Sequence, residues 1–290
     1  MTDISVGAFQ VSQVIEQVAP LAPARAFFPD LTQEMLEVCQ RELPPGHLTS
    51  DGAVLLSFHA YVVRTERHVI LVDTCCGNEK DLPGVPQFSN LKTNFLPALA
   101  VANVVPEQVD FVMCTHLHFD HVGWNTRWMN GTWCPTFPNA KYIISKKEYE
   151  YWDQLSRSGL VNLHTASFKQ SVKPIVRQAL LVEDDFGLED GIWVEPCPGH
   201  TPGNFVIHLA SMGDHGLITG DVIHHQLQLR YPSLSSRADD DRDLARVTRT
   251  ALIERCADTS RLLLPGHFPA PSVGRIVSAS SGGYRYVAAA

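Results

Sequence analysis

The sequence predicts an α/β fold in which helices cover β-sheets. From Ala53 to Val63, apolar and other side chains alternate with the two-residue period of a strand. Strand-like and helix-like segments interleave along the rest of the chain, with no internal repeat or low-complexity tract. The chain has 290 residues, of which 44% are hydrophobic, so it can bury the core of one large domain.

The individual elements follow from these periods and from the Pro and Gly residues that interrupt them. Strands are predicted at 53–63, 68–72, 109–114, 142–144, 192–195, 205–209, 217–219 and 262–264, and helices at 31–43, 94–104, 146–156, 169–181 and 243–256. Residues 1–45 are rich in proline and are predicted to form an irregular N-terminal arm. Residues 46–290 are predicted to form the main domain.

The composition argues against several classes of partner. The formal charge is -8 and no basic run is present, which disfavours nucleic-acid binding. Neither a secretory signal nor an apolar segment long enough to span a bilayer is recognisable. The seven cysteines contain no C-x-x-C pair, so a reduced cytoplasm is the expected location. A small-molecule substrate is the expected partner, there is no expected membrane partner, and a homodimer stays open.

A dense group of metal-ligand side chains follows the predicted strand at 109–114. His116, His118, Asp120 and His121 fall within six residues, directly after that strand. Imidazole and carboxylate ligands favour zinc, iron, manganese or cobalt, and the absence of thiolates argues against a structural zinc site rich in cysteine. A lone histidine is usually an ordinary surface or core residue, and six others in this chain are interpreted so: His47, His59, His68, His164, His208 and His215.

Three further candidates stand at the ends of predicted strands. His200, Asp221 and His267 each follow a short apolar run and have Gly beside them, two of them also Pro nearby. Those residues allow tight turns that bring a side chain to the edge of a sheet.

Taken in order, these residues resemble the metal-binding signature of the metallo-β-lactamase superfamily. The resemblance covers roughly residues 53–270 and implies a four-layer αββα sandwich with the active site along the sheet edge. It implies one metal on His116, His118 and His200, and a second on Asp120, His121 and His267. Asp221 would bridge the two metals.

The resemblance also implies an enzyme. Two adjacent divalent ions, zinc being the first choice and iron, manganese or cobalt the alternatives, would lower the pKa of a shared water, so that a metal-bridging hydroxide could attack an ester, lactone or phosphotriester bond. Asp120, Asp221 and His224 are the candidate catalytic residues. Two alternatives stay open: a metal-binding module that has lost hydrolysis, and a single-iron dioxygenase.

Within the superfamily the chain is most similar to the N-acyl homoserine lactonase and methyl parathion hydrolase group. Lactonases of that group carry a tyrosine three residues after the bridging aspartate, where this chain has His224. A histidine at this position resembles the phosphotriesterases of the group more than its lactonases. His224 could hydrogen-bond the substrate or could be an ordinary loop histidine. Asp73 resembles the family's early aspartate and could orient the histidine loop or simply cap a turn.

A partly apolar substrate is expected from aromatic residues close to these motifs in sequence. They are Phe88, Phe119, Trp124, Trp128 and Phe268. Aromatic residues are more often ordinary core, which is the alternative interpretation of each.

Overall fold

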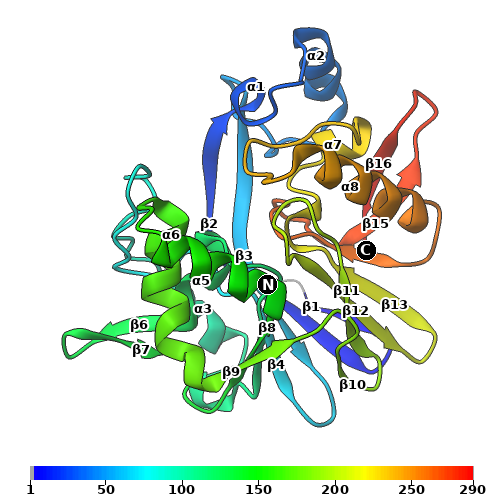
Figure 1. Ribbon diagram of the computed structural model, residues 1–290. Coiled ribbons are helices and arrows are strands. Elements are labelled where there is room, and N and C mark those ends of the chain that lie inside the picture. The colour runs from blue at the N-terminus through cyan, green and yellow to red at the C-terminus, as the bar shows by residue number, and fades with distance from the viewer. Residues whose placement is uncertain (1–2, 290) are drawn as a thin grey trace. The chain divides into compact units, whose positions relative to one another are not determined.

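The computed structural model describes residues 3–289, which divide into two compact units. The N-terminal unit comprises residues up to 17 together with Phe58–Phe186, and the C-terminal unit comprises Val18–Ser57 together with residues from 187 onward. Strands β2 and β3 each continue from one unit into the other. Figure 1 shows the course of the chain through both units.

The N-terminal unit is built on a mixed sheet whose strand order is β1-β2-β3-β4-β5-β8-β9. Its strands are β1 (Asp3–Val6), β2 (Phe9–Pro23), β3 (Ala53–Arg64), β4 (Val69–Val72), β5 (Phe111–Met113), β8 (Lys141–Ser145) and β9 (Ala179–Val182), and a separate hairpin pairs β6 (Thr126–Met129) with β7 (Thr132–Pro135). Its helices are α3 (Phe95–Val101), α4 (Phe119–Val122), α5 (Lys146–Arg157) and α6 (Leu163–Ser167). Helix α5 contacts β8 and β9 (Figure 1).

Four parallel strands form one side of this sheet. β4, β5, β8 and β9 pair in parallel, with Val72 opposite Met113 and Met113 opposite Ile143. Parallel strands covered on both faces are expected to be almost continuously apolar, as the sequences of β4 and β5 are. The carboxyl ends of β4 and β5 therefore lie next to each other, which is the usual edge for a functional site in such sheets.

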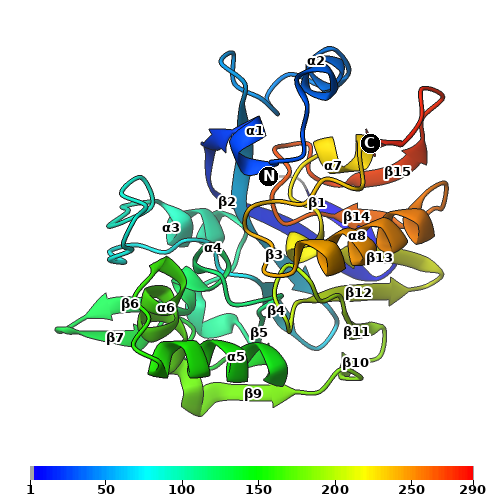
Figure 2. The same ribbon diagram turned by 45° about the horizontal axis from the view of Figure 1, so that its top comes forward.

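The C-terminal unit contains a second sheet with the order β10-β11-β12-β13-β14-β15-β16. These strands are β10 (Gly187–Glu189), β11 (Ile192–Pro196), β12 (Phe205–Ser211), β13 (Asp214–Ile218), β14 (Leu262–Leu264), β15 (Gly274–Ser278) and β16 (Tyr284–Ala288). The helices are α1 (Ala24–Phe27), α2 (Gln33–Glu42), α7 (Leu227–Arg230) and α8 (Arg242–Cys256). Helix α8 lies against β15 (Figure 2).

The prediction of an irregular N-terminal stretch is wrong for residues 3–23, which form β1 and β2. Alternation is obscured there because the polar side chains of Ser12 and Gln13 are buried beside Val11 and Val14. The helix predicted at 169–181 is also wrong, since Pro174 cannot continue a helical ladder and the chain instead forms a π turn, a 3₁₀ turn and β9.

The apolar residues of the expected arm are buried within the C-terminal unit itself. Phe27, Phe28 and Leu31 pack in one cluster with Val54 and Leu227. Their burial therefore needs no neighbouring subunit, and both the domain boundary at residue 45 and the homodimer stay predictions. Among residues 3–289, no helix combines the length and the apolar character needed to cross a bilayer.

Candidate metal centre

In the N-terminal unit, the carboxyl ends of β4 and β5 supply the predicted histidine loop and its support. β4 ends at Val72 and is followed by Asp73, and β5 ends at Met113 and leads to His116. Asp73 has a φ of 57°, an uncommon conformation for a residue with a side chain and one often found at functional sites.

The Asp73 carboxylate makes several of the hydrogen bonds that support the histidine loop. Its Oδ1 accepts a hydrogen bond from the Thr115 backbone N–H (2.8 Å), and its Oδ2 accepts one from the Thr115 hydroxyl (2.8 Å). The same Oδ2 lies 2.8 Å from His121 Nδ1. Asp73 therefore orients the histidine loop, as the first of its two sequence-based interpretations expected, and it does so from a buried position.

These contacts fix which nitrogen of each ring carries the proton. A carboxylate only accepts, so His121 Nδ1 must donate to Asp73, which leaves His121 Nε2 with a bare lone pair. The Thr115 hydroxyl gives its proton to Asp73 and therefore accepts from His116 Nδ1, 3.1 Å away. His116 Nε2 is unprotonated for the same reason, and an unprotonated Nε2 is what a metal ion needs.

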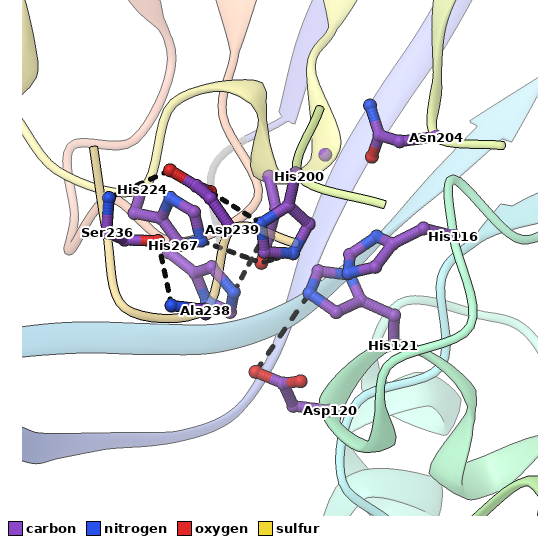
Figure 3. Close-up of polar contacts among 12 residues, drawn as sticks. His116, Asp120, His121, His200, Asn204, His224, Ser236, Ala238, Asp239 and His267 are labelled. Carbon is purple, nitrogen blue, oxygen red and sulfur yellow. Dashed lines mark hydrogen bonds and ion pairs between the residues drawn. The ribbon is translucent and has the colours of Figure 1, made fainter. Parts of the chain in front are cut away.

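The four candidate ligands of this unit are held close together. The ring centroid of His116 lies 4.7 Å from that of His118 and 4.1 Å from that of His121. Asp120 Oδ2 lies 4.0 Å from His121 Nε2 (Figure 3). Gly123 stands two residues after His121, and a Cβ there would come within 1.8 Å of the Cys76 carbonyl oxygen, so only glycine lets the loop pack this closely.

Helix α5 anchors the same loop through a side chain that sequence reasoning missed. Glu148 Oε1 accepts hydrogen bonds from the Leu117 backbone N–H (3.0 Å) and from Trp152 Nε1 (2.7 Å). His164, interpreted from sequence as an ordinary histidine, packs against His118 with ring centroids 4.0 Å apart. Both residues come from outside the motif, so no local spacing could have indicated them.

In the C-terminal unit, two predicted ligands stand at equivalent places on adjacent parallel strands. Ile218 of β13 pairs with Leu264 of β14, and each is followed three residues later by a candidate ligand, Asp221 and His267 respectively. His200 lies on the turn between β11 and β12. Gly199 has a φ of 128°, and a Cβ there would lie 2.3 Å from the Ala245 backbone nitrogen, so this turn also requires glycine.

Three imidazoles converge on the Asp221 carboxylate. His200 Nε2 lies 3.3 Å from Asp221 Oδ2, His267 Nε2 lies 3.1 Å from Oδ1, and His224 Nε2 lies 3.3 Å from Oδ2. Figure 3 shows the rings of His200, His224 and His267 close to one another. All four residues are buried.

In His200 and His267, the other ring nitrogen, Nδ1, makes a hydrogen bond. His200 Nδ1 lies 2.9 Å from Asp239 Oδ1 and His267 Nδ1 lies 3.1 Å from the Ser57 carbonyl oxygen, so in each ring Nδ1 is the donor. In the neutral tautomer, bare Nε2 lone pairs then face the oxygens of Asp221. Acceptors facing acceptors repel unless a cation lies between them, so this donor set fits a bound metal ion.

Asp239 is the main residue that the sequence analysis missed. Its Oδ2 accepts a hydrogen bond from the Ser236 backbone N–H (2.8 Å) and lies 3.8 Å from Nη1 of the buried Arg249. Burial alone would raise the pKa of Asp239, but the hydrogen bond and charge of His200, with the charges of His224 and Arg249, outweigh it and lower the pKa to about 2. Asp239 is therefore a carboxylate at neutral pH and holds His200 as Asp73 holds His121.

His224 differs from its neighbours, because neither of its ring nitrogens makes a hydrogen bond among residues 3–289. Its ring packs edge-on against Phe27, with centroids 5.5 Å apart. Burial lowers the pKa of His224, although the nearby Asp221 opposes that shift. A neutral imidazole beside the Asp221 carboxylate can donate to a substrate or bind a metal.

The aromatic residues expected to line an apolar pocket fall into separate groups. Phe88 packs against Phe119 with centroids 5.4 Å apart, Trp124 and Trp128 border a different hollow, and Phe268 belongs to the core of the C-terminal unit.

The comparison with known families identifies the chain. The sequence pattern of the metallo-beta-lactamase superfamily matches residues 56–267. The chain belongs to this superfamily. The matched segment contains every candidate ligand from His116 to His267.

The curated relatives are enzymes or presumed enzymes of similar type. An N-acyl homoserine lactonase of Bacillus cereus is 26% identical over 174 residues, which are 56% of this chain and 60% of that protein. The probable metallo-hydrolase YybB of Bacillus subtilis (strain 168) is 25% identical over 175 residues, 59% of this chain and 64% of that protein. The matched part of the chain thus spans about three fifths of the length of these relatives.

Solved structures match over nearly the whole chain. AidC, described as a dizinc quorum-quenching lactonase, is 20% identical with a TM-score of 0.83, covering 100% of this chain and 97% of that one. AbOPH, a hydrolase in the beta-lactamase superfamily, is 24% identical with a TM-score of 0.83, covering 99% and 97%. These likenesses show the fold, and they confirm the predicted metallo-β-lactamase fold class.

Proposed function

We propose that the chain is a metal-dependent hydrolase that holds two divalent transition-metal ions, with zinc as the first choice, and cleaves an ester, lactone or phosphotriester bond of a small, partly apolar substrate. The observation that carries the proposal is the orientation of His121, His200 and His267, in which Nδ1 faces a hydrogen-bond acceptor, so that in the neutral ring Nε2 carries the lone pair that a metal ion needs. Superfamily membership and relatives named as lactonases and metallo-hydrolases support it.

The ligand assignment follows the order of the motifs along the chain. His116, His118 and His200 would hold one metal, Asp120, His121 and His267 the other, and Asp221 would be shared. The bound metals would make a water acidic enough to supply hydroxide near neutral pH and would polarise the substrate oxygen.

The chain's own residues would prepare that chemistry. Asp73 and Asp239 keep the proton of His121 and of His200 on Nδ1, so the ligand nitrogens are ready without rearrangement. His224 would donate a hydrogen bond to the reacting group from beside Asp221. A histidine here in place of the lactonase tyrosine favours phosphotriesters or aryl esters over lactones.

Elemental analysis and a hydrolysis screen test the proposal together. Protein purified with added zinc, and separately with iron, manganese or cobalt, should contain two metal ions per chain and hydrolyse at least one of an acyl homoserine lactone, an aryl ester and a phosphotriester. His200→Ala should lose metal and activity, whereas His215→Ala, a change to a histidine outside the site, should lose neither.

Three results would contradict the proposal. A single iron with oxygen consumption would support the dioxygenase alternative, and two metals without hydrolysis of any tested ester would support a binding module. A stoichiometry of one or none after metal loading would exclude the two-metal arrangement.

A further inference from the structure

A hollow in the N-terminal unit contains none of the predicted metal ligands. Its volume is about 390 Å³, and its lining residues are Asn78, Glu79, Lys92, Trp124, Arg127 and Trp128. A hollow of this size can hold a small organic molecule. Its lining combines charged side chains with two indole rings, which is unusual for a purely structural gap.

The charges in this hollow are not neutralised in pairs. Among residues 3–289, Lys92, Arg127 and Glu79 make no ion pair and no side-chain hydrogen bond that holds them to one another or to a neighbour. The Nε of Arg127 is shielded from solvent and has no hydrogen-bond acceptor. A shielded donor without an acceptor is costly in a folded protein, and an oxygen of a bound ligand would satisfy it.

The net charge of the lining selects the type of anion. Two cationic side chains and one carboxylate leave one excess positive charge, although the whole chain carries -8. That excess matches a monoanion, and Glu79 would repel a second negative charge. The planar guanidinium of Arg127 can bind a carboxylate through two parallel hydrogen bonds.

The indole of Trp128 offers a flat apolar surface, and its neighbour Trp133 holds it in place. Its side chain is 46% exposed, and its ring packs edge-on against Trp133 at a centroid distance of 5.1 Å. Lys80 Nζ lies 3.5 Å above the Trp133 ring and donates to Thr126 Oγ1 (2.6 Å). Because the hairpin β6–β7 is tied down in this way, Trp128 can accept a ring without being reordered.

Trp124 is fixed as firmly at another wall. Its Nε1 donates to Glu16 Oε1 (2.7 Å), and its ring stacks on Phe95 at 5.6 Å with an angle of 22°. Its polar atom is therefore already satisfied, and it contributes only apolar surface to the hollow.

We propose that this hollow is a binding site for a small aromatic carboxylate, with the carboxylate on Arg127 and Lys92 and the ring on Trp128. The site is separate from the metal ligands and does not depend on the proposed hydrolysis. Binding of such an acid would therefore persist in a protein that proves inactive.

Calorimetric titration of the metal-loaded full chain with benzoate tests the proposal. We expect saturable 1:1 binding, weaker binding of the uncharged benzyl alcohol, and no comparable binding of inorganic phosphate. Arg127→Met and Trp128→Ala should each weaken benzoate binding by about tenfold or more. Arg177→Met, a change to another arginine of the same unit outside the hollow, should bind as the wild type does.

Several results would overturn the assignment. They are no benzoate binding by the wild type, unchanged binding by Arg127→Met, or phosphate binding tighter than benzoate. If Arg127→Met does not fold, which far-UV circular dichroism would show, then Lys92→Gln decides, because Lys92 is exposed and its loss does not disturb the core. Unchanged benzoate affinity in that variant would equally reject the site.

Discussion

Replacing Asp73 by Asn should switch the proton positions of two metal ligands at once. The Asn side chain keeps one acceptor oxygen, which can still receive the Thr115 N–H, but its NH₂ group then faces the Thr115 hydroxyl and His121 Nδ1. His121 Nδ1 must then accept, so its proton moves to Nε2. The Thr115 hydroxyl, now an acceptor from Asn, can turn its proton toward His116 Nδ1, which moves that ring's proton to Nε2 as well.

The expected effect is a large loss of metal affinity with a retained fold. Loss of one such supporting hydrogen bond typically weakens metal binding by about 10- to 100-fold, or roughly 1.4–2.8 kcal/mol. Because two ligands are affected in Asp73→Asn, the loss should lie at or above the upper end of that range. Thr115→Val removes only the branch to His116 and should cost less than Asp73→Asn.

Competition with a chromophoric chelator measures the metal affinity of each variant. The kcat/KM at saturating metal measures the catalytic activity that the metal-loaded variant retains. Asp110→Asn is a matched control, because the Asp110 carboxylate also receives a backbone hydrogen bond at a strand end, from Val69 N at 2.8 Å, but contacts no candidate ligand. Wild-type affinity in Asp73→Asn, or an equal loss in Asp110→Asn, would refute the proton-switch reasoning.

The remaining predictions concern the bridging carboxylate, its neighbour and a buried histidine. Asp221→Asn should weaken both metals and lower turnover by orders of magnitude without unfolding the chain, and unchanged kinetics would remove its bridging role. His224→Ala should keep both metals and reduce turnover by a factor on the order of 100, and His224→Tyr should favour lactones over phosphotriesters; lost metal in His224→Ala would make His224 a ligand. Burial lowers the pKa of His47 to about 4 in the folded chain, so the unfolded chain binds more protons between pH 4 and about 6.5, and stability should fall by about 3 kcal/mol as pH drops through that window. Denaturant titrations should show this dependence reduced in His47→Gln and kept in His215→Gln; an identical pH dependence in both variants would contradict it.

Secondary structure was predictable wherever one physical signal dominated. Helices α2, α5 and α8 are preceded by the N-cap residues Thr32, Ser145 and Asp241, whose side chains accept the expected N-terminal hydrogen bonds. The hairpin of β1 and β2 was not predictable, because buried Ser12 and Gln13 break the alternation and Pro20 suggests a loop. Pro20 is exposed near the end of β2, where proline is tolerated in a strand better than at its centre.

The candidate ligands were predictable for a different reason from their partners. A ligand at a strand end has a recognisable local sequence pattern: a short apolar run and a glycine precede it, as they precede His267. Asp239 lacks this sequence pattern, because it stands in a run of three aspartates that is typical of a solvent-exposed loop. Its partner Arg249 lies ten residues away on α8, where a buried arginine is the exception.

The candidate ligands of each unit are held by the same kind of arrangement, which indicates where specificity can vary. In the N-terminal unit β4 and β5 end together, and in the C-terminal unit β13 and β14 do, so each pair of parallel strands presents neighbouring turns. In each unit, an aspartate outside the predicted ligand set accepts a hydrogen bond from Nδ1 of a candidate ligand: Asp73 from His121, and Asp239 from His200. Substitution of His121 or His200 is therefore expected to cost metal binding. His224 Nδ1 has no hydrogen-bond partner among residues 3–289, and its Nε2 faces only Asp221, at 3.3 Å. It is therefore the position beside Asp221 where a substitution can alter the substrate while the metal ligands keep their support.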